Sequence, residues 1–163
     1  MYHHARMVLA ALLSALHVLT LGVGLGAVFV RGLRLRGLRR APDDAAALKG
    51  LLAADGLWGV AAASWIITGL LRAFAGLEKA STFYTHNGFF LVKMGLFLAV
   101  FVLEIRPIIT FSSWRRARAA GRTPWTSADA PLGALIRAND LEVALTVLIP
   151  FAAALMARGA WLF

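Results

Sequence analysis

The sequence has no cysteine and few acidic residues. Without thiols, the chain forms no disulfide and holds no thiolate-bound metal, no iron–sulfur cluster and no covalently attached c-type haem. Any haem is therefore expected to be held non-covalently. Eight Asp and Glu residues stand against 17 Lys and Arg residues, so the formal net charge is +9. Such a surplus suits a nucleic acid or an anionic membrane surface.

The motifs of several enzyme classes are also missing. No nucleophile elbow, Walker loop, H-E-x-x-H helix or Rossmann fingerprint occurs in the sequence. Hydrolases and nucleotide-dependent enzymes that rely on these motifs therefore have no support. Any chemistry must come from isolated polar residues.

Apolar residues, in contrast, are abundant. They make up 60% of the 163 residues, with 15% charged, whereas soluble domains are about 45–50% apolar and about 25% charged. Apolar stretches of about 18 or more residues are typical of membrane-spanning helices. Four such stretches are predicted, at about 7–30, 52–74, 87–111 and 138–160. The expected fold is all-α: a single integral membrane four-helix bundle that uses residues 1–163.

Two arginine-rich segments predict the orientation of this bundle. "RGLRLRGLRR" follows the first span and "SSWRRARAAGR" follows the third, and together they hold nine arginines. We interpret both as loops, which the positive-inside rule places in the cytoplasm. Both termini are then expected on the outer side. The same charge suits anionic lipid headgroups, so the bilayer is the expected partner and nucleic acid is not.

One face of the second span carries a regular pattern. Residues spaced by three and four positions share a helix face, and here they are Asp55, Trp58, Ala62, Trp65, Gly69 and Arg72. This face is expected to point into the bundle. Asp55 and Arg72 are interpreted as ties between helix ends, and Asp140 as a cap at the start of the fourth span.

His17 is the one histidine that lies deep in a span. It follows Met7 by ten residues, roughly 15 Å of helix. A single imidazole inside a bundle can be an axial ligand of haem, with its other nitrogen bonded to a second group. A lone buried histidine is more often an ordinary hydrogen-bonded core residue, and spacing alone does not establish haem ligation.

Lys93 lies within the apolar run "FFLVKMGLF". A charge in a membrane span is costly and is often functional. Lys93 either extends to the outer headgroups or faces the bundle, where it needs an anion. The acidic residues lie at other depths: Asp55, Glu104, Asp140 and Glu142 toward the cytoplasm, Glu78 in the outer loop. A bundle-facing Lys93 would therefore need a bound anion, and a haem propionate is the simplest.

The other three histidines suggest a different site. His3, His4 and His86 would come together if the amino terminus folded over the outer end of the third span. Three imidazoles suit copper or zinc.

Several segments, taken together, carry a family resemblance over nearly the whole chain. They are "HVLTLGVGLGAVFVR", "AADGLWGVAAASWIITGLLRAF", "GLEKASTFY", "LVKMGLFLAVFVLEIRP" and "VLIPFAAALMARG". The chain resembles the uncharacterised bacterial membrane family called domain of unknown function 2214. More distantly, its layout is similar to the four-helix group of the HemJ-type protoporphyrinogen oxidase and copper-resistance protein D.

The HemJ-type resemblance implies a bound b-type haem, with functional roles for His17 and Lys93. Leu91 stands where that type has a histidine, and its fourth-helix R-x-x-N-E-x-P is only loosely matched by Arg137, Asn139 and Asp140. The resemblance thus extends to haem binding rather than to porphyrinogen oxidation.

The expected function is therefore that of a redox protein of the bacterial inner membrane. It would carry electrons or oxidise a membrane-soluble substrate, with His17 ligating haem b, Lys93 and Arg72 contacting propionates, and Trp65 forming a pocket wall. Two alternatives remain open. One is a copper-handling or other metal-handling protein that uses His3, His4 and His86. The other is a cofactor-free subunit of a larger membrane complex or homo-oligomer.

Overall fold

The structure is a computed structural model that describes residues 2–75 and 81–161. Its long helices are α1 (Tyr2–Arg40), α2 (Ala45–Phe74), α4 (Gly88–Ala119) and α5 (Leu132–Ala157). A short helix, α3 (Ser81–Thr85), precedes α4, and a 3₁₀ turn, η1 (Pro124–Thr126), lies between α4 and α5. The expected all-helical fold is confirmed.

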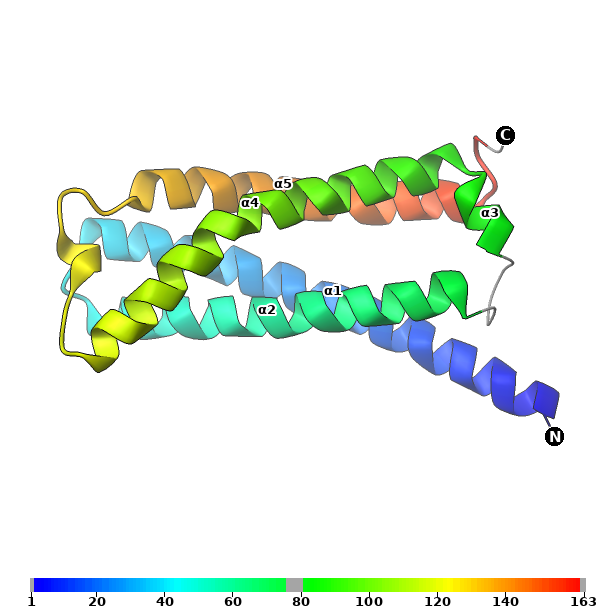
Figure 1. Ribbon diagram of the computed structural model, residues 1–163, viewed down its shortest axis with the longest axis horizontal. Helices are drawn as coiled ribbons and strands as arrows, with labels where there is room; N and C mark the ends of the chain where they lie inside the picture. Colours follow the sequence, from blue (N-terminus) through cyan, green and yellow to red (C-terminus); the bar gives the residue numbers. More distant parts are fainter. Residues whose placement is uncertain (1, 76–80, 162–163) are drawn as a thin grey trace.

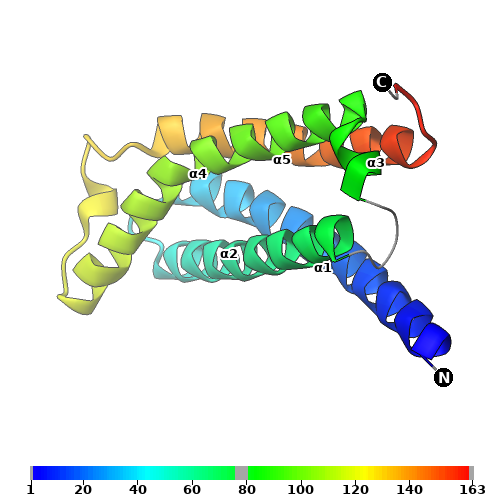
Figure 2. The ribbon, with the colours of Figure 1, turned by 45° about the vertical axis from the view of Figure 1, so that its right-hand side comes forward.

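The long helices form one elongated bundle (Figure 1). α1 and α2 make one antiparallel pair, α4 and α5 make another, and α1 also packs on α5. Both termini lie at the same end, called here the terminal end. The opposite end carries the two arginine-rich segments and is called the arginine-rich end. The first turns of α1 extend away from the other helices in both views (Figures 1 and 2).

All four long helices are long and apolar enough to cross a membrane. They are, however, longer than the predicted spans. α1 continues to Arg40 and α4 to Ala119, so most of both arginine-rich segments is helix and the prediction of loops there was wrong. Arginine and leucine are good helix formers. Hydropathy marks where a helix leaves the lipid rather than where the helix ends.

The helix starts follow local capping chemistry. The Asp44 side chain accepts hydrogen bonds from the amides of Ala46 and Ala47 at the start of α2. The Asn87 side chain accepts from the amides of Phe89 and Phe90 at the start of α4. The predicted cap at Asp140 was wrong, because α5 begins at Leu132 and Asp140 lies about two turns inside it.

The largest apolar core lies at the arginine-rich end. It is built from buried side chains of all four long helices and η1, among them Leu38, Leu51, Phe111, Trp125 and Leu135. A smaller cluster around Val28 and Trp58 lies next to it along the bundle. Several fully buried polar residues, among them Arg31, Asn139 and Glu142, lie in this half of the bundle.

Candidate functional site

His17 is half-buried on α1 and is bonded to α2. Its Nδ1 lies 2.9 Å from the Thr68 hydroxyl. That hydroxyl has one proton, which it donates to its own helix, since the Ser64 and Trp65 carbonyls lie 2.8 and 3.2 Å away. If that proton stays with the helix carbonyls, the hydroxyl accepts from His17, so that Nδ1 carries the imidazole proton and Nε2 the lone pair.

Aromatic side chains of α2 and α4 lie beside His17. The Trp65 ring centroid lies 5.6 Å from the imidazole centroid, and Phe97 of α4 packs edge-on to Trp65 at 6.1 Å. Gly69 has no side chain, and a Cβ there would approach the imidazole Cε1 to 3.2 Å. The Trp65 indole nitrogen is buried and has no hydrogen-bond partner among the described residues.

Lys93 and Arg72 lie toward the terminal end from this layer. Lys93 is one turn of α4 from Phe97, and Arg72 is two turns of α2 from Trp65. The two cations are close enough to repel each other. The Lys93 ammonium lies 5.1 Å from the Phe90 ring centroid, a cation–π contact. In the described part of the chain no carboxylate pairs with Lys93, and Glu78 is outside the described residues.

The structure thus brings His17 and Trp65 into contact, with the two cations on neighbouring turns. The other histidines lie elsewhere. His4 is exposed, and exposed His86 has its Nδ1 3.1 Å from the Thr85 hydroxyl. The His3 side chain is outside the described residues. No group of three or more possible metal ligands occurs among the described residues, and the predicted copper or zinc site stays a prediction.

A second polar site lies nearer the arginine-rich end and centres on Arg31. Its side chain is completely buried, nine residues before the end of α1. The guanidinium donates to Asn139 at 2.8 Å and to both oxygens of Glu104 at 2.7 and 3.0 Å. It also donates to Asp55 at 3.1 Å and to Glu142. Arg31 therefore links α1 to α2, α4 and α5, and we call this cluster the Arg31 junction.

Neighbouring residues support the Arg31 junction. Arg115 of α4 donates to the other oxygen of Asp55 at 2.7 Å. A Cβ at Gly32 would lie 2.5 Å from the Asn139 amide nitrogen, so glycine is needed where α1 meets α5. Nearer the surface, Arg36 donates to both oxygens of Asp140, at 2.6 and 2.7 Å.

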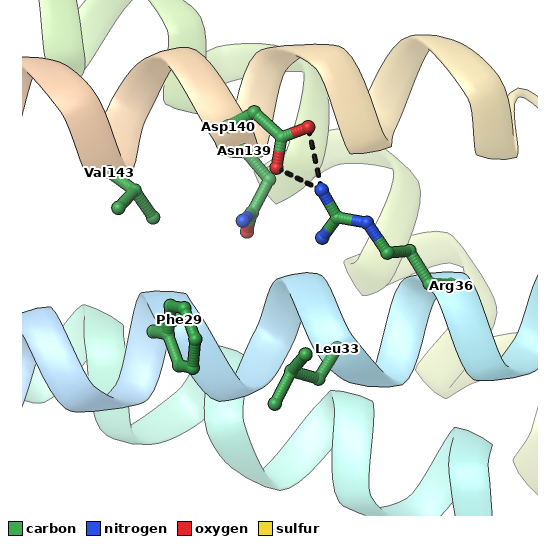
Figure 3. Close-up of a pocket in the computed structure, with 6 residues that line it drawn as sticks. All are labelled: Phe29, Leu33, Arg36, Asn139, Asp140 and Val143. Carbon is green, nitrogen blue, oxygen red and sulfur yellow. Dashed lines mark hydrogen bonds and ion pairs between the residues drawn. The ribbon is translucent and has the colours of Figure 1, made fainter.

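The Arg36–Asp140 pair is at one side of a pocket between α1 and α5. Figure 3 shows its lining: Phe29, Leu33, Arg36, Asn139, Asp140 and Val143. Because Asn139 also belongs to the Arg31 junction, this pocket lies beside the buried charges.

Sequence reasoning missed the Arg31 junction. Arg31 was assigned to a cytoplasmic loop, and Asp55 and Glu104 were interpreted as residues near helix ends. A usable signal was present, because Val28, Arg31, Leu35 and Leu38 repeat at three- and four-residue spacing and all are buried. The bundle-facing pattern of α2 was predicted correctly, and its members Asp55, Trp58 and Trp65 are buried.

Comparison with known proteins agrees with the membrane fold. The family model described as "Predicted membrane protein (DUF2214)" matches residues 9–160. No curated protein and no solved structure matches the chain.

Proposed function

This chain belongs to the DUF2214 family of predicted membrane proteins, and we propose that it is a b-type haem protein with a redox role in the bacterial inner membrane. His17 would be the axial ligand. The role would be electron transfer or the oxidation of a membrane-soluble substrate.

The hydrogen bond between His17 and Thr68 carries this proposal. Histidines that ligate metals usually donate their other ring N–H to a nearby acceptor, which orients the ring and makes the ligating nitrogen more basic. Thr68 would be that acceptor here, since its hydroxyl lies 2.9 Å from Nδ1 and can donate its own proton to the Ser64 carbonyl of α2. The arrangement presents Nε2 as the ligating atom.

The surrounding donor groups fit the rest of a haem. The macrocycle is flat and apolar with two carboxylates, and Trp65 and Phe97 supply an aromatic wall beside His17. Lys93, Arg72 and the unpartnered Trp65 indole N–H are positioned for anionic or hydrogen-bond-accepting groups. When bound, the haem iron would supply one-electron redox chemistry.

The residues of the chain would then tune that chemistry. Thr68 would hold the imidazole at one angle, and the cations would stabilise propionate charge. We also propose that the arginine-rich end faces the cytoplasm, because nine arginines lie there. Both termini would then face the periplasm.

Haem occupancy of purified His17→Ala tests the proposal. Wild-type protein, produced in cells supplied with a haem precursor and purified in detergent, should show a sharp Soret band. His17→Ala should lose the band and keep wild-type helicity by circular dichroism. Thr68→Val should weaken haem binding by about 10–100-fold, whereas Thr20→Val, whose hydroxyl bonds only its own helix, should not.

Three results would contradict parts of this proposal. A colourless wild-type protein would exclude haem, and a Soret band retained by His17→Ala would exclude that ligand. Loss of bound copper or zinc in His3→Ala, His4→Ala or His86→Ala would favour the metal-handling alternative instead.

A further inference from the structure

The Arg31 junction contains more negative than positive charge. Three carboxylates, from Asp55, Glu104 and Glu142, meet two guanidinium groups, from Arg31 and Arg115. Asn139 is neutral, and the neighbouring Arg36–Asp140 pair is balanced. If every group is charged, one negative charge remains inside an apolar bundle, where an uncompensated charge is very costly.

Glu142 is the carboxylate on which this charge is hardest to keep. Its side chain is completely buried, whereas those of Asp55 and Glu104 are 9% and 12% exposed. Asp55 also has two arginine partners, and Glu104 is held at both oxygens. Glu142 uses one oxygen, Oε2, for Arg31, and its Oε1 has no hydrogen-bond partner among the described residues.

An independent observation points to the same place. The Thr146 hydroxyl is also fully buried and without a partner in the described part of the chain. Thr146 follows Glu142 by one turn on the same face of α5, and helical side chains tilt toward the N-terminus. Thr146 and Glu142 thus carry two unpartnered polar atoms one turn apart on one face of α5, and these two atoms do not bond each other.

A proton on Glu142 Oε1 would resolve both features. The neutral carboxylic acid gains an O–H donor that can turn to the unpartnered Thr146 hydroxyl one turn away, and Oε2 still accepts from Arg31. Binding of the proton also cancels the surplus negative charge of the Arg31 junction. A metal cation fits less well, because the Arg31 guanidinium already contacts the same carboxyl group.

We propose that the Arg31 junction is a proton-binding site, in which Glu142 takes up and releases one proton against Thr146. Release leaves an unpaired negative charge where α1, α2, α4 and α5 meet. Proton exchange is therefore coupled to the packing of α5 on the other helices. This site is independent of haem, and its groups are contributed by all four long helices.

Infrared difference spectroscopy of the purified full chain in detergent tests this proposal. A pH titration should reveal the carbonyl stretch of a buried carboxylic acid, with a shift in heavy water. Glu142→Gln should abolish that band and melt at the wild-type temperature, because the amide has the shape of the neutral acid. Glu104→Gln should move the titration of the band to lower pH and melt lower, because it removes one of the three carboxylates and a two-oxygen pair with Arg31.

Thr146→Val provides a second readout. Without the hydroxyl acceptor, the carbonyl band should move to higher frequency. This variant tests the proton-binding proposal if Glu142→Gln fails to fold. A band that is absent from wild type across the range where it stays folded would overturn the proposal. So would a band retained in Glu142→Gln, a band that titrates at higher pH in Glu104→Gln, or a band unmoved in Thr146→Val.

Discussion

A guanidinium enclosed by four membrane helices has no water to hydrate it, so its stability depends entirely on its protein partners. Arg31 meets this need with Asn139 and three carboxylates, including both oxygens of Glu104. Arginine suits the position better than lysine, since its planar fork donates in several fixed directions at once. The contacts of this one side chain reach every other long helix.

The Lys93 side chain has surroundings that differ from those of Arg31. It is half-buried, contacts the Phe90 ring, and has no carboxylate partner among the described residues. If it serves a haem propionate, Lys93→Met should lower haem occupancy or shift the redox potential while the helices remain intact. Spectroscopic redox titration of wild type and variant measures both. Equal occupancy and potential would mean that Lys93 only extends along an apolar helix to reach the headgroups.

At the scale of single helices, glycine positions decide how closely neighbours approach. Gly32 faces Asn139 with no room for a Cβ, whereas a Cβ at Gly22 would meet no atom within 4 Å. Gly22 and Gly26 have the spacing of the G-x-x-x-G motif of packed membrane helices, but a Cβ at Gly26 would likewise meet no atom within 4 Å in the described chain. The close approach at Gly32 is thus made by a glycine outside that motif.

These two glycines give a matched pair of variants. Gly32→Ala should destabilise the protein by about 1–3 kcal/mol, because overpacking displaces the Asn139 side chain that holds Arg31. Gly22→Ala should be neutral or stabilising by up to about 1 kcal/mol, since alanine is the better helix former. Thermal unfolding in detergent, followed by circular dichroism, measures both. Equal melting temperatures would contradict the close contact at Gly32.

Much of this helical arrangement follows from sequence, for identifiable reasons. Runs of apolar residues predict four spans because lipid requires them, and the α2 pattern predicts a buried face because helical period is local. The contact between His17 and Trp65 depends on how α1 and α2 are aligned, which no local pattern specifies. Arg31 was missed because an arginine just after an apolar run has the same local signature whether it is buried or solvated.

For the whole molecule, the structure places both termini at one end and the arginine-rich segments at the other (Figure 1). The proposed orientation puts the arginine-rich end in the cytoplasm. A reporter that works only in the periplasm should therefore be active when fused after Phe163. A reporter that works only in the cytoplasm should be active when inserted between α1 and α2, at residues 41–44. Cytoplasmic activity of the fusion after Phe163 would reverse the orientation.

The central structural claim is that the Arg31 junction ties the four long helices into one bundle. Removing one partner of a buried ion pair costs about 3–5 kcal/mol, since the remaining charges are left uncompensated. For a chain of this size, that cost corresponds to a melting temperature lowered by roughly 6–20 °C. Arg34, exposed on the same helix, provides the control.

The most direct measurement compares the melting temperatures of wild type, Arg31→Met and Arg34→Met in the same detergent, followed by circular dichroism. We expect Arg31→Met to melt at least about 6 °C below wild type and Arg34→Met to melt close to it. An Arg31→Met protein that melts with wild type would contradict the claim that a buried guanidinium holds the bundle together.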